Sequence, residues 1–192
     1  PRPPSDKRER VVRAATEAVY TRGFHKSSLA DIARKAEVPL GSVYYFFKTK
    51  DALGRAVVDT QNAVYSAHTD TWGQLPDPAA RLVAFLGMTL ENKETLSQLG
   101  CPVATLCGEL RKEGGELGDH AATVFDNLLG WLSAQFEQLG QGAASRGHAE
   151  HLLGAIEGAT LLTHTFGDVA YVEREAARLT AWIETLRPEV SA

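Results

Sequence analysis

A single proline, Pro39, most constrains how the first part of this 192-residue chain can fold. Proline has no backbone N–H and disfavours helical angles at the residue before it, so one helix is expected to end here and another to begin. Apolar residues recur at helical spacing over residues 29–36, and Ser28 followed three residues later by Asp31 is a capping-box signal for a helix start. Residues 40–47 then predict a second short helix. The segment is therefore expected to form two short helices joined by a tight turn.

Two kinds of structure contain such a helix pair: a plain αα-hairpin in a helical core, and a helix-turn-helix, whose second helix enters the major groove of DNA. Spacing alone leaves both open. Residues 1–50 carry 11 Lys and Arg against 5 Asp and Glu, whereas residues 51–192 carry 9 against 19, so the overall charge of −4 conceals a basic N-terminal part. Because a basic surface attracts DNA phosphates, the charge distribution favours DNA binding.

The composition, with 44% hydrophobic and 23% charged residues, is that of a globular protein that can bury its own core. No apolar run reaches the ~18 residues of a membrane-spanning helix, and the N-terminal sequence lacks the apolar stretch of a signal peptide. We therefore expect a cytoplasmic protein with no membrane partner. The two cysteines, Cys101 and Cys107, are too few for a disulfide framework and are expected to be thiols.

Helical periodicity continues along the chain without strand-like alternation, so the sequence predicts an all-α fold. A helix over residues 6–22, which Gly23 ends, is expected to pack on the helix pair and complete a three-helix domain over residues 1–50. Residues 1–5 are expected to be a disordered arm, in which Arg2 either reaches a minor groove or makes no contact. A larger helical domain is expected over residues 51–192. Its predicted helices cover residues 51–72, 79–96, 103–110, 117–139, 148–167 and 173–186.

The sequence around the helix pair resembles the signature of the TetR family of bacterial transcriptional repressors. The matching positions keep their apolar, small or basic character at fixed spacing. They are Ile32, Ala33, Ala36, Val38, Gly41, Tyr44, Phe47, Lys50 and Leu53. The stretch GCPVATLCGEL, residues 100–110, also resembles a segment found in one branch of this family. The rest of the chain is similar to the family only in its layout of helices.

The resemblance implies a DNA-binding repressor that acts as a homodimer on a palindromic operator, with one helix-turn-helix domain per subunit in residues 1–50. It also implies that residues 51–192 form a ligand-binding and dimerisation domain. A small-molecule inducer bound there would change the separation of the two recognition helices and release the operator. We expect no catalytic residues, no cofactor and no metal.

Three positions depart from the family's pattern in the turn and the second helix. Glu37 stands where the family usually has Gly. A non-Gly residue at positive φ costs about 1–2 kcal/mol, which leaves open whether the turn keeps that conformation. Pro39 stands where Ser or Thr commonly caps the second helix. Phe46 replaces a frequent His and removes that side chain's bond to a phosphate.

Eight residues are predicted to contact DNA. Lys50 combines a cation with the N-terminal dipole of the next helix, and tyrosines offer hydroxyls to phosphates and ring edges to thymine methyls. Ser28 has helix capping as its alternative role. Since the second helix contains no Arg, Asn or Gln, DNA shape and water are expected to carry much of the specificity. The eight are Ser28, Leu40, Gly41, Ser42, Tyr44, Tyr45, Lys48 and Lys50.

Dimerisation is also expected on physical grounds, because one short helix reads few base pairs and a two-fold dimer faces two half-sites. Apolar residues of the last two helices are the candidate interface, with Gly154 and Gly158 permitting close approach. Packing within one subunit is their alternative role. The candidates are Leu152, Leu153, Ile156, Thr160, Leu179, Trp182, Ile183 and Leu186.

Aromatic and soft side chains of the middle helices are the candidate lining of a pocket for a hydrophobic inducer. For each of them, plain core packing is the alternative. They are Phe85, Met88, Leu106, Cys107, Phe125, Leu128, Trp131 and His164.

Two other functional classes stay open. Cys101 lies near a predicted helix start, where the helix dipole can lower a thiol pKa, so a redox or electrophile sensor on the same scaffold is the alternative function. Two buried thiols that act as small hydrophobes are the plainer interpretation. An all-α enzyme or small-molecule-binding module is less expected, since the sequence contains no CxxC, HExxH or phosphate-binding glycine loop. His148 and His151 share a helix face but would need a third ligand to hold a metal.

Overall fold

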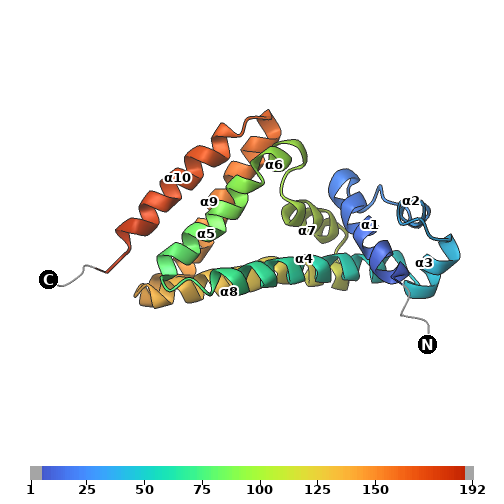
Figure 1. The fold of residues 1–192 in the computed structure, drawn as a ribbon, viewed down its shortest axis with the longest axis horizontal. Coiled ribbons are helices and arrows are strands. Elements are labelled where there is room, and N and C mark those ends of the chain that lie inside the picture. Colours follow the sequence, from blue (N-terminus) through green and yellow to red (C-terminus); the bar gives the residue numbers. More distant parts are fainter. Residues whose placement is uncertain (1–5, 189–192) are drawn as a thin grey trace. The chain divides into compact units, whose positions relative to one another are not determined.

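The computed structural model describes residues 6–188, apart from the side chain of Glu113 (Figure 1). The arm predicted at residues 1–5, including Arg2, lies outside the described residues. Over the described range every regular element is a helix, which confirms the all-α prediction. None of the helices in that range has the length and apolar character needed to cross a membrane.

The described residues form two compact units. Unit 1 contains the described residues up to Val64 together with Pro102–Val124, and unit 2 contains Tyr65–Cys101 and the described residues from Phe125 onward. The long helices α4 (Lys50–Trp72) and α8 (Gly115–Gln138) each contribute to both units. The functional boundary predicted at residue 50 stays a prediction.

Unit 1 is organised around α1 (Lys7–Arg22), α2 (Leu29–Lys35) and α3 (Leu40–Phe46), and it also contains α7 (Pro102–Glu113). One apolar face of α1 packs against both α2 and α3, as the sequence predicted. The buried apolar side chains of these helices include Val11, Ala15, Val19, Ile32, Ala33 and Val43. This small core fixes which face of α3 points away from the protein.

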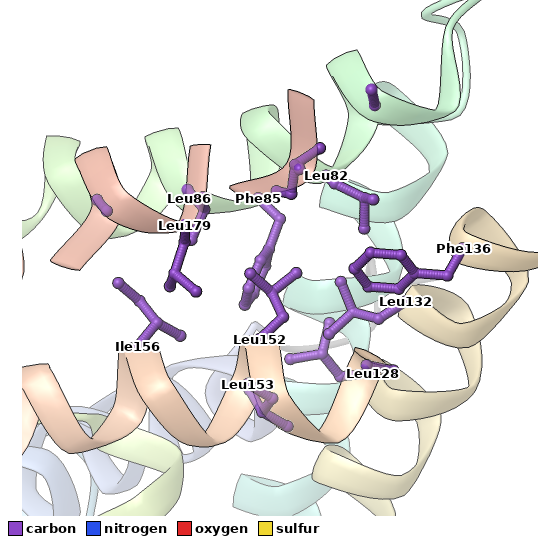
Figure 2. Close-up of a cluster of buried hydrophobic side chains, with 14 of the residues drawn as sticks. Leu82, Phe85, Leu86, Leu128, Leu132, Phe136, Leu152, Leu153, Ile156 and Leu179 are labelled. Atoms are coloured by element: carbon purple, nitrogen blue, oxygen red, sulfur yellow. The ribbon is translucent and has the colours of Figure 1, made fainter. Parts of the chain in front are cut away.

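Unit 2 contains α5 (Pro78–Glu91), α6 (Lys93–Leu99), a short 3-10 helix (Gly142–Ala144), α9 (Ser145–Phe166) and α10 (Ala170–Thr185). In Figure 2, labelled side chains of α5, α8, α9 and α10 meet in one apolar cluster. The labelled members are Leu82, Phe85, Leu86, Leu128, Leu132, Phe136, Leu152, Leu153, Ile156 and Leu179.

The single helix predicted over residues 79–96 is divided in the structure. Helix α5 ends at Glu91, and Asn92 adopts φ −100° and ψ 7° before α6 begins. The side-chain amide of Asn92 donates a hydrogen bond to the carbonyl of Met88 at 2.8 Å. Asparagine often bonds to nearby backbone in this way and so competes with helix continuation. Apolar residues recur at helical spacing on both sides of Asn92 without interruption. Periodicity alone therefore could not show that the helix ends there.

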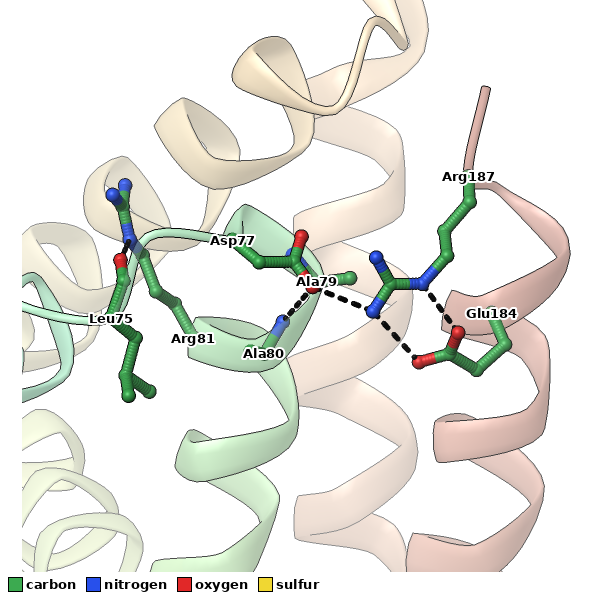
Figure 3. A network of polar contacts seen from close by, with 7 residues as sticks. All are labelled: Leu75, Asp77, Ala79, Ala80, Arg81, Glu184 and Arg187. Atoms are coloured by element: carbon green, nitrogen blue, oxygen red, sulfur yellow. Dashed lines mark hydrogen bonds and ion pairs between the residues drawn. The ribbon is translucent and has the colours of Figure 1, made fainter. Parts of the chain in front are cut away.

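A polar network joins the end of α10 to the start of α5 (Figure 3). The carboxylate of Asp77 caps α5 by accepting from the N–H groups of Ala79 and Ala80, at 3.1 and 3.3 Å. Arg187 forms an ion pair with Asp77 at 2.6 Å and a second one with Glu184. The hydrogen bond from Arg187 holds the pKa of Asp77 below its usual value. Through these bonds the start of α5 and the end of α10 are held together beyond their apolar contacts.

The residues predicted to form a dimer interface lie largely inside unit 2, and their role in a dimer stays a prediction. Six of them are buried and the other two are half-buried against the same core, which is their alternative role. The buried six are Leu152, Leu153, Ile156, Thr160, Leu179 and Ile183, and the half-buried two are Trp182 and Leu186. Periodicity identified the apolar face of each helix but not whether α5 and α8 of the same chain cover it.

Candidate nucleic-acid interface

The first helix of the candidate site, α2, begins where the capping-box signal placed it. The hydroxyl of Ser28 accepts a hydrogen bond from the backbone N–H of Asp31 at 3.1 Å and donates one to its carboxylate at 2.6 Å. The bond from Ser28 lowers the pKa of Asp31. Capping, the alternative role of Ser28, is therefore observed, and it anchors the start of the helix pair.

The turn between α2 and α3 keeps a left-handed residue although no glycine is present. Glu37 has φ 53°, and within the described residues no other non-glycine residue has a positive φ. Arg10 of α1 donates hydrogen bonds to the carbonyl oxygens of Ala36 and Glu37, at 2.6 and 3.0 Å, and lies 3.6 Å from the Glu37 carboxylate. No local pattern indicated this role for Arg10, because it lies 26 residues before the turn.

The recognition-helix candidate, α3, has one face in the core and one face exposed. Val43 and the following Phe47 are buried. On the opposite face Leu40 is 40% exposed, Tyr44 49% and Tyr45 74%. A Cβ added at Gly41 would meet no atom within 4 Å, so the helix backbone can be approached closely there. Large side chains left in solvent beside a formed core indicate a surface that binds a partner.

Lys50 starts α4 and is held in place by the loop between α1 and α2. Its ammonium donates to the carbonyl of His25 at 3.0 Å and lies 4.7 Å from the centre of the Phe24 ring. An ammonium has three donors, so a further bond remains possible for a phosphate oxygen. Of the other predicted contacts, Ser42 is half-buried and Lys48 is exposed, with its ammonium 5.9 Å from the ring of Tyr45.

Part of the positive charge of unit 1 is used within the unit. Arg34 pairs with Asp31 at 2.8 Å and Lys35 with Glu17 at 2.5 Å. Arg8 was not identified from the sequence. Its guanidinium lies 5.4 Å from the ring centre of Phe47, at the end of α3, which adds a cation beside that helix. Because Arg8 and Phe47 are far apart in the sequence, no local sequence pattern predicts this contact.

The side chains predicted to line an inducer pocket are divided between the two units. In unit 2, Phe85 and Leu128 are buried, and Met88, Phe125 and Trp131 pack against the same core. His164 is exposed, with its Nδ1 3.2 Å from the carbonyl of Ser97.

The remaining two, Leu106 and Cys107, belong to α7 in unit 1. Leu106 is buried there, and the thiol of Cys107 lies 3.2 Å from the carbonyl of Ala121. A groove of about 670 Å³ in the same unit is lined by different residues. They are Arg8, Glu9, Val12, Arg13, Thr16, Glu17, Tyr20, Thr60, Gln61 and Pro102.

Cys101 is buried in unit 2 and shares a hydrogen bond with the carboxyl of Glu157, whose pKa is raised by burial. The burial of Cys101 agrees with its interpretation as a small hydrophobe. His148 and His151 both contact the ring of Trp182, at 5.4 and 4.9 Å between ring centres. In the described part of the chain no three His, Cys, Asp or Glu side chains gather as metal ligands would.

Comparison with known proteins finds a family model that matches the N-terminal part of the chain. Residues 11–57, which contain most of α1, all of α2 and α3, and the start of α4, match the model of the family described as bacterial regulatory proteins, tetR family. The chain is 28% identical over 173 residues to the HTH-type transcriptional regulator LmrA of Bacillus subtilis, covering 83% of this chain and 87% of LmrA.

Two further proteins agree with this match. The HTH-type transcriptional repressor DhaR of Mycobacterium sp. is 32% identical over 108 residues, which cover 54% of this chain and 52% of DhaR. The reduced form of Escherichia coli NemR has the same fold, with a TM-score of 0.81, 20% identity, and coverage of 97% of this chain and all of NemR. Residues 11–57 therefore match the tetR family of bacterial regulatory proteins, and most of the chain is similar to an HTH-type transcriptional regulator.

Proposed function

We propose that the chain represses transcription by inserting α3 into the major groove of a palindromic operator as a homodimer. The observation that carries the proposal is the division of α3 into two faces. Val43 is fully buried, whereas Leu40, Tyr44 and Tyr45 are exposed although they are large. When the core fixes the inner face of a helix, its outer face forms a rigid surface that can contact the bases of DNA.

The proposed contacts fall into two groups. Leu40, Gly41, Ser42, Tyr44 and Tyr45 face the bases, with methyl contacts, close backbone approach and hydroxyl bonds as their means of recognition. Lys48, Lys50 and the start of α2 at Ser28 face the phosphates, together with Arg8, which lies beside the end of α3. Because this set lacks a bidentate base reader, we expect DNA shape and bridging waters to contribute much of the specificity.

For the dimer, we propose that a second copy covers the exposed face of α9. Leu161, Leu162 and Phe166 are 64%, 42% and 63% exposed, in contrast to the buried leucines of the same helix. On the same helix, a Cβ added at Gly154 or Gly158 would meet no atom within 4 Å, so close approach of another helix is possible. Burial of three large apolar side chains on one helix supplies part of the interface that a stable dimer needs.

We place the inducer in unit 2, where aromatic side chains lie at the edge of the core. Trp131 lies 5.5 Å from Trp72 between ring centres, and Met88 and Phe125 pack against the same core. This lining suits a small hydrophobic molecule. Tryptophan fluorescence would report such binding directly.

A thiol sensor remains the alternative, and it requires that Cys101→Ser abolish the response of DNA binding to an electrophile. We propose that the protein acts in the cytoplasm.

The proposal is tested by fluorescence anisotropy of labelled duplex DNA, titrated with the purified chain at several salt concentrations. We expect affinity to fall steeply with salt, since each phosphate contact contributes a slope of about −0.9 in log K against log salt. Duplex DNA that binds with no salt dependence, or not at all, would refute the proposed DNA-binding function.

A further inference from the structure

The loop between α1 and α2 is held by side chains from two other helices of unit 1. The backbone N–H of His25 donates to a carboxylate oxygen of Glu109 in α7 at 3.2 Å, and the ring of His25 lies 4.0 Å from the same oxygen. The backbone carbonyl of His25 accepts the hydrogen bond from Lys50 in α4 at 3.0 Å. One residue of this loop therefore connects a carboxylate in α7 to the ammonium that begins α4.

Gly23 shows how closely Glu109 approaches the loop. Its backbone has φ 88° and ψ 159°, a conformation that L side chains rarely adopt. A Cβ at this position would overlap one oxygen of the Glu109 carboxylate and would lie 3.1 Å from the other. The carboxylate thus occupies the place of the missing side chain, so any other residue at position 23 would have to displace the Glu109 carboxylate.

The other side of the loop is packed against the first turns of α4. The ring of Phe24 is buried, meets the ring of His25 edge-on at 5.6 Å, and lies beneath the ammonium of Lys50. A Cβ added at Gly54 of α4 would lie 2.8 Å from the Phe24 ring. Since Phe24 and His25 of this loop both contact Lys50, a displacement of the loop would also displace the groups that hold the Lys50 ammonium.

We propose that Glu109 is a positioning residue of the DNA-binding surface. Its carboxylate fixes the loop between α1 and α2, and the loop in turn fixes the ammonium of Lys50 where it can meet a DNA phosphate. This inference rests on the proposed function, in which Lys50 binds a phosphate. The affinity for DNA would then depend on Glu109, a residue of α7 that does not itself touch DNA.

Removal of the Glu109 carboxylate should change the affinity for DNA in opposite directions under simple electrostatics and under the positioning role. A carboxylate repels phosphates, so its loss alone would strengthen DNA binding. If Glu109 positions Lys50, its loss weakens binding instead. The direction of the change therefore separates the two explanations.

The experiment compares Glu109→Ala, Glu109→Gln and the matched control Glu116→Ala. Glu116 lies in α8 of the same unit and pairs with Arg55 at 2.8 Å, and its side chain is 92% exposed. The measurement is anisotropy of a labelled duplex selected from a random library by the unaltered chain, over a range of salt concentrations. Circular dichroism verifies that each variant is folded.

We expect Glu109→Ala to weaken binding on the order of tenfold, the effect of losing one hydrogen bond to a charged group. Its slope of log K against log salt should become shallower by about 1, because Lys50 no longer neutralises a phosphate. Glu109→Gln keeps an oxygen that can accept from His25 and should retain most of the affinity. Glu116→Ala should bind no more weakly than the unaltered chain, with the same slope.

An alanine variant at Glu109 that binds as tightly as the unaltered chain, with the same slope, overturns the positioning role and leaves the proposed function intact. Absence of salt-dependent binding by the unaltered chain refutes both. The approach of Glu109 to Gly23 is tested separately by Gly23→Ala, whose effect on the unfolding midpoint should be smaller in the Glu109→Ala background. Simple addition of the two effects would show that Gly23 and Glu109 are not coupled.

Discussion

At the scale of single residues, Glu37 illustrates how a strained backbone position is maintained. Its positive φ costs about 1–2 kcal/mol for a residue with a Cβ. Arg10 donates to the carbonyl oxygens of Ala36 and Glu37, and hydrogen bonds from a charged donor contribute about 1.5–3 kcal/mol. The turn therefore keeps the conformation that the helix pair needs without the glycine that usually supplies it.

Replacing Glu37 by glycine should raise the free energy of unfolding by up to about 1 kcal/mol, because the gain from removing strain exceeds the entropy cost of glycine. Urea denaturation measures the change. Glu37→Ala is the matched control, since it removes the same carboxylate but keeps the Cβ, and it should give no gain. A glycine variant no more stable than the alanine variant would show that the position is not strained.

At the scale of elements, α3 and α9 each combine a face that belongs to the core with a face that the core does not use. In α3 the exposed face carries Tyr44 and Tyr45, and in α9 it carries Leu161, Leu162 and Phe166. Stability and function should therefore respond to different substitutions on the same helix.

In α3, Val43→Ala should lower the free energy of unfolding by on the order of 2 kcal/mol, because it leaves a cavity at a fully buried site. Tyr45→Ala should change stability by less than about 0.5 kcal/mol, as is usual for surface positions. It should nevertheless weaken binding to a selected duplex by on the order of 1 kcal/mol. The two variants are compared by denaturation and by anisotropy. A Tyr45→Ala variant that binds the duplex as tightly as the unaltered chain would exclude this face as the DNA-binding surface.

In α9, Leu161→Lys should weaken the dimer by on the order of 2 kcal/mol, about thirtyfold in dissociation constant, if a second copy covers this face. Analytical ultracentrifugation over a range of concentrations measures the shift. Val64→Lys is the matched control, because Val64 is an equally apolar side chain, 45% exposed, on α4. An unchanged dimer in Leu161→Lys would place the interface elsewhere.

At the scale of the whole molecule, the sequence predicted the features that depend on local patterns. Pro39, the cap at Ser28 and helical periodicity were sufficient for the all-α class, the helix pair and its inward side chains. Contacts between distant segments were not predictable in this way. The support of the turn by Arg10 and the approach of Glu109 to Gly23 depend on how helices far apart in sequence pack together. The burial of Ile156 in its own subunit has the same origin.

The stability of unit 2 should depend on acid through Asp77, which links α5 to Arg187. The pKa of Asp77 is lowered from 3.8, so its ionised form contributes stability above that value, and the contribution is lost as pH falls through the lowered pKa. Asp77→Asn keeps a helix cap but removes the charge. It should melt at a lower temperature than the unaltered chain at neutral pH, and the difference should vanish in acid. Asp70→Asn, at an exposed position of α4, is the control and should show no such dependence.

Selection of binding sites from a random duplex library by the purified chain tests whether the exposed face of α3 reads DNA. We predict enrichment of a two-fold symmetric sequence with half-sites about one helical turn apart, and loss of that enrichment in a chain with both Tyr44→Ala and Tyr45→Ala. No enriched sequence, or the same sequence enriched equally by the double variant, would contradict this role of α3.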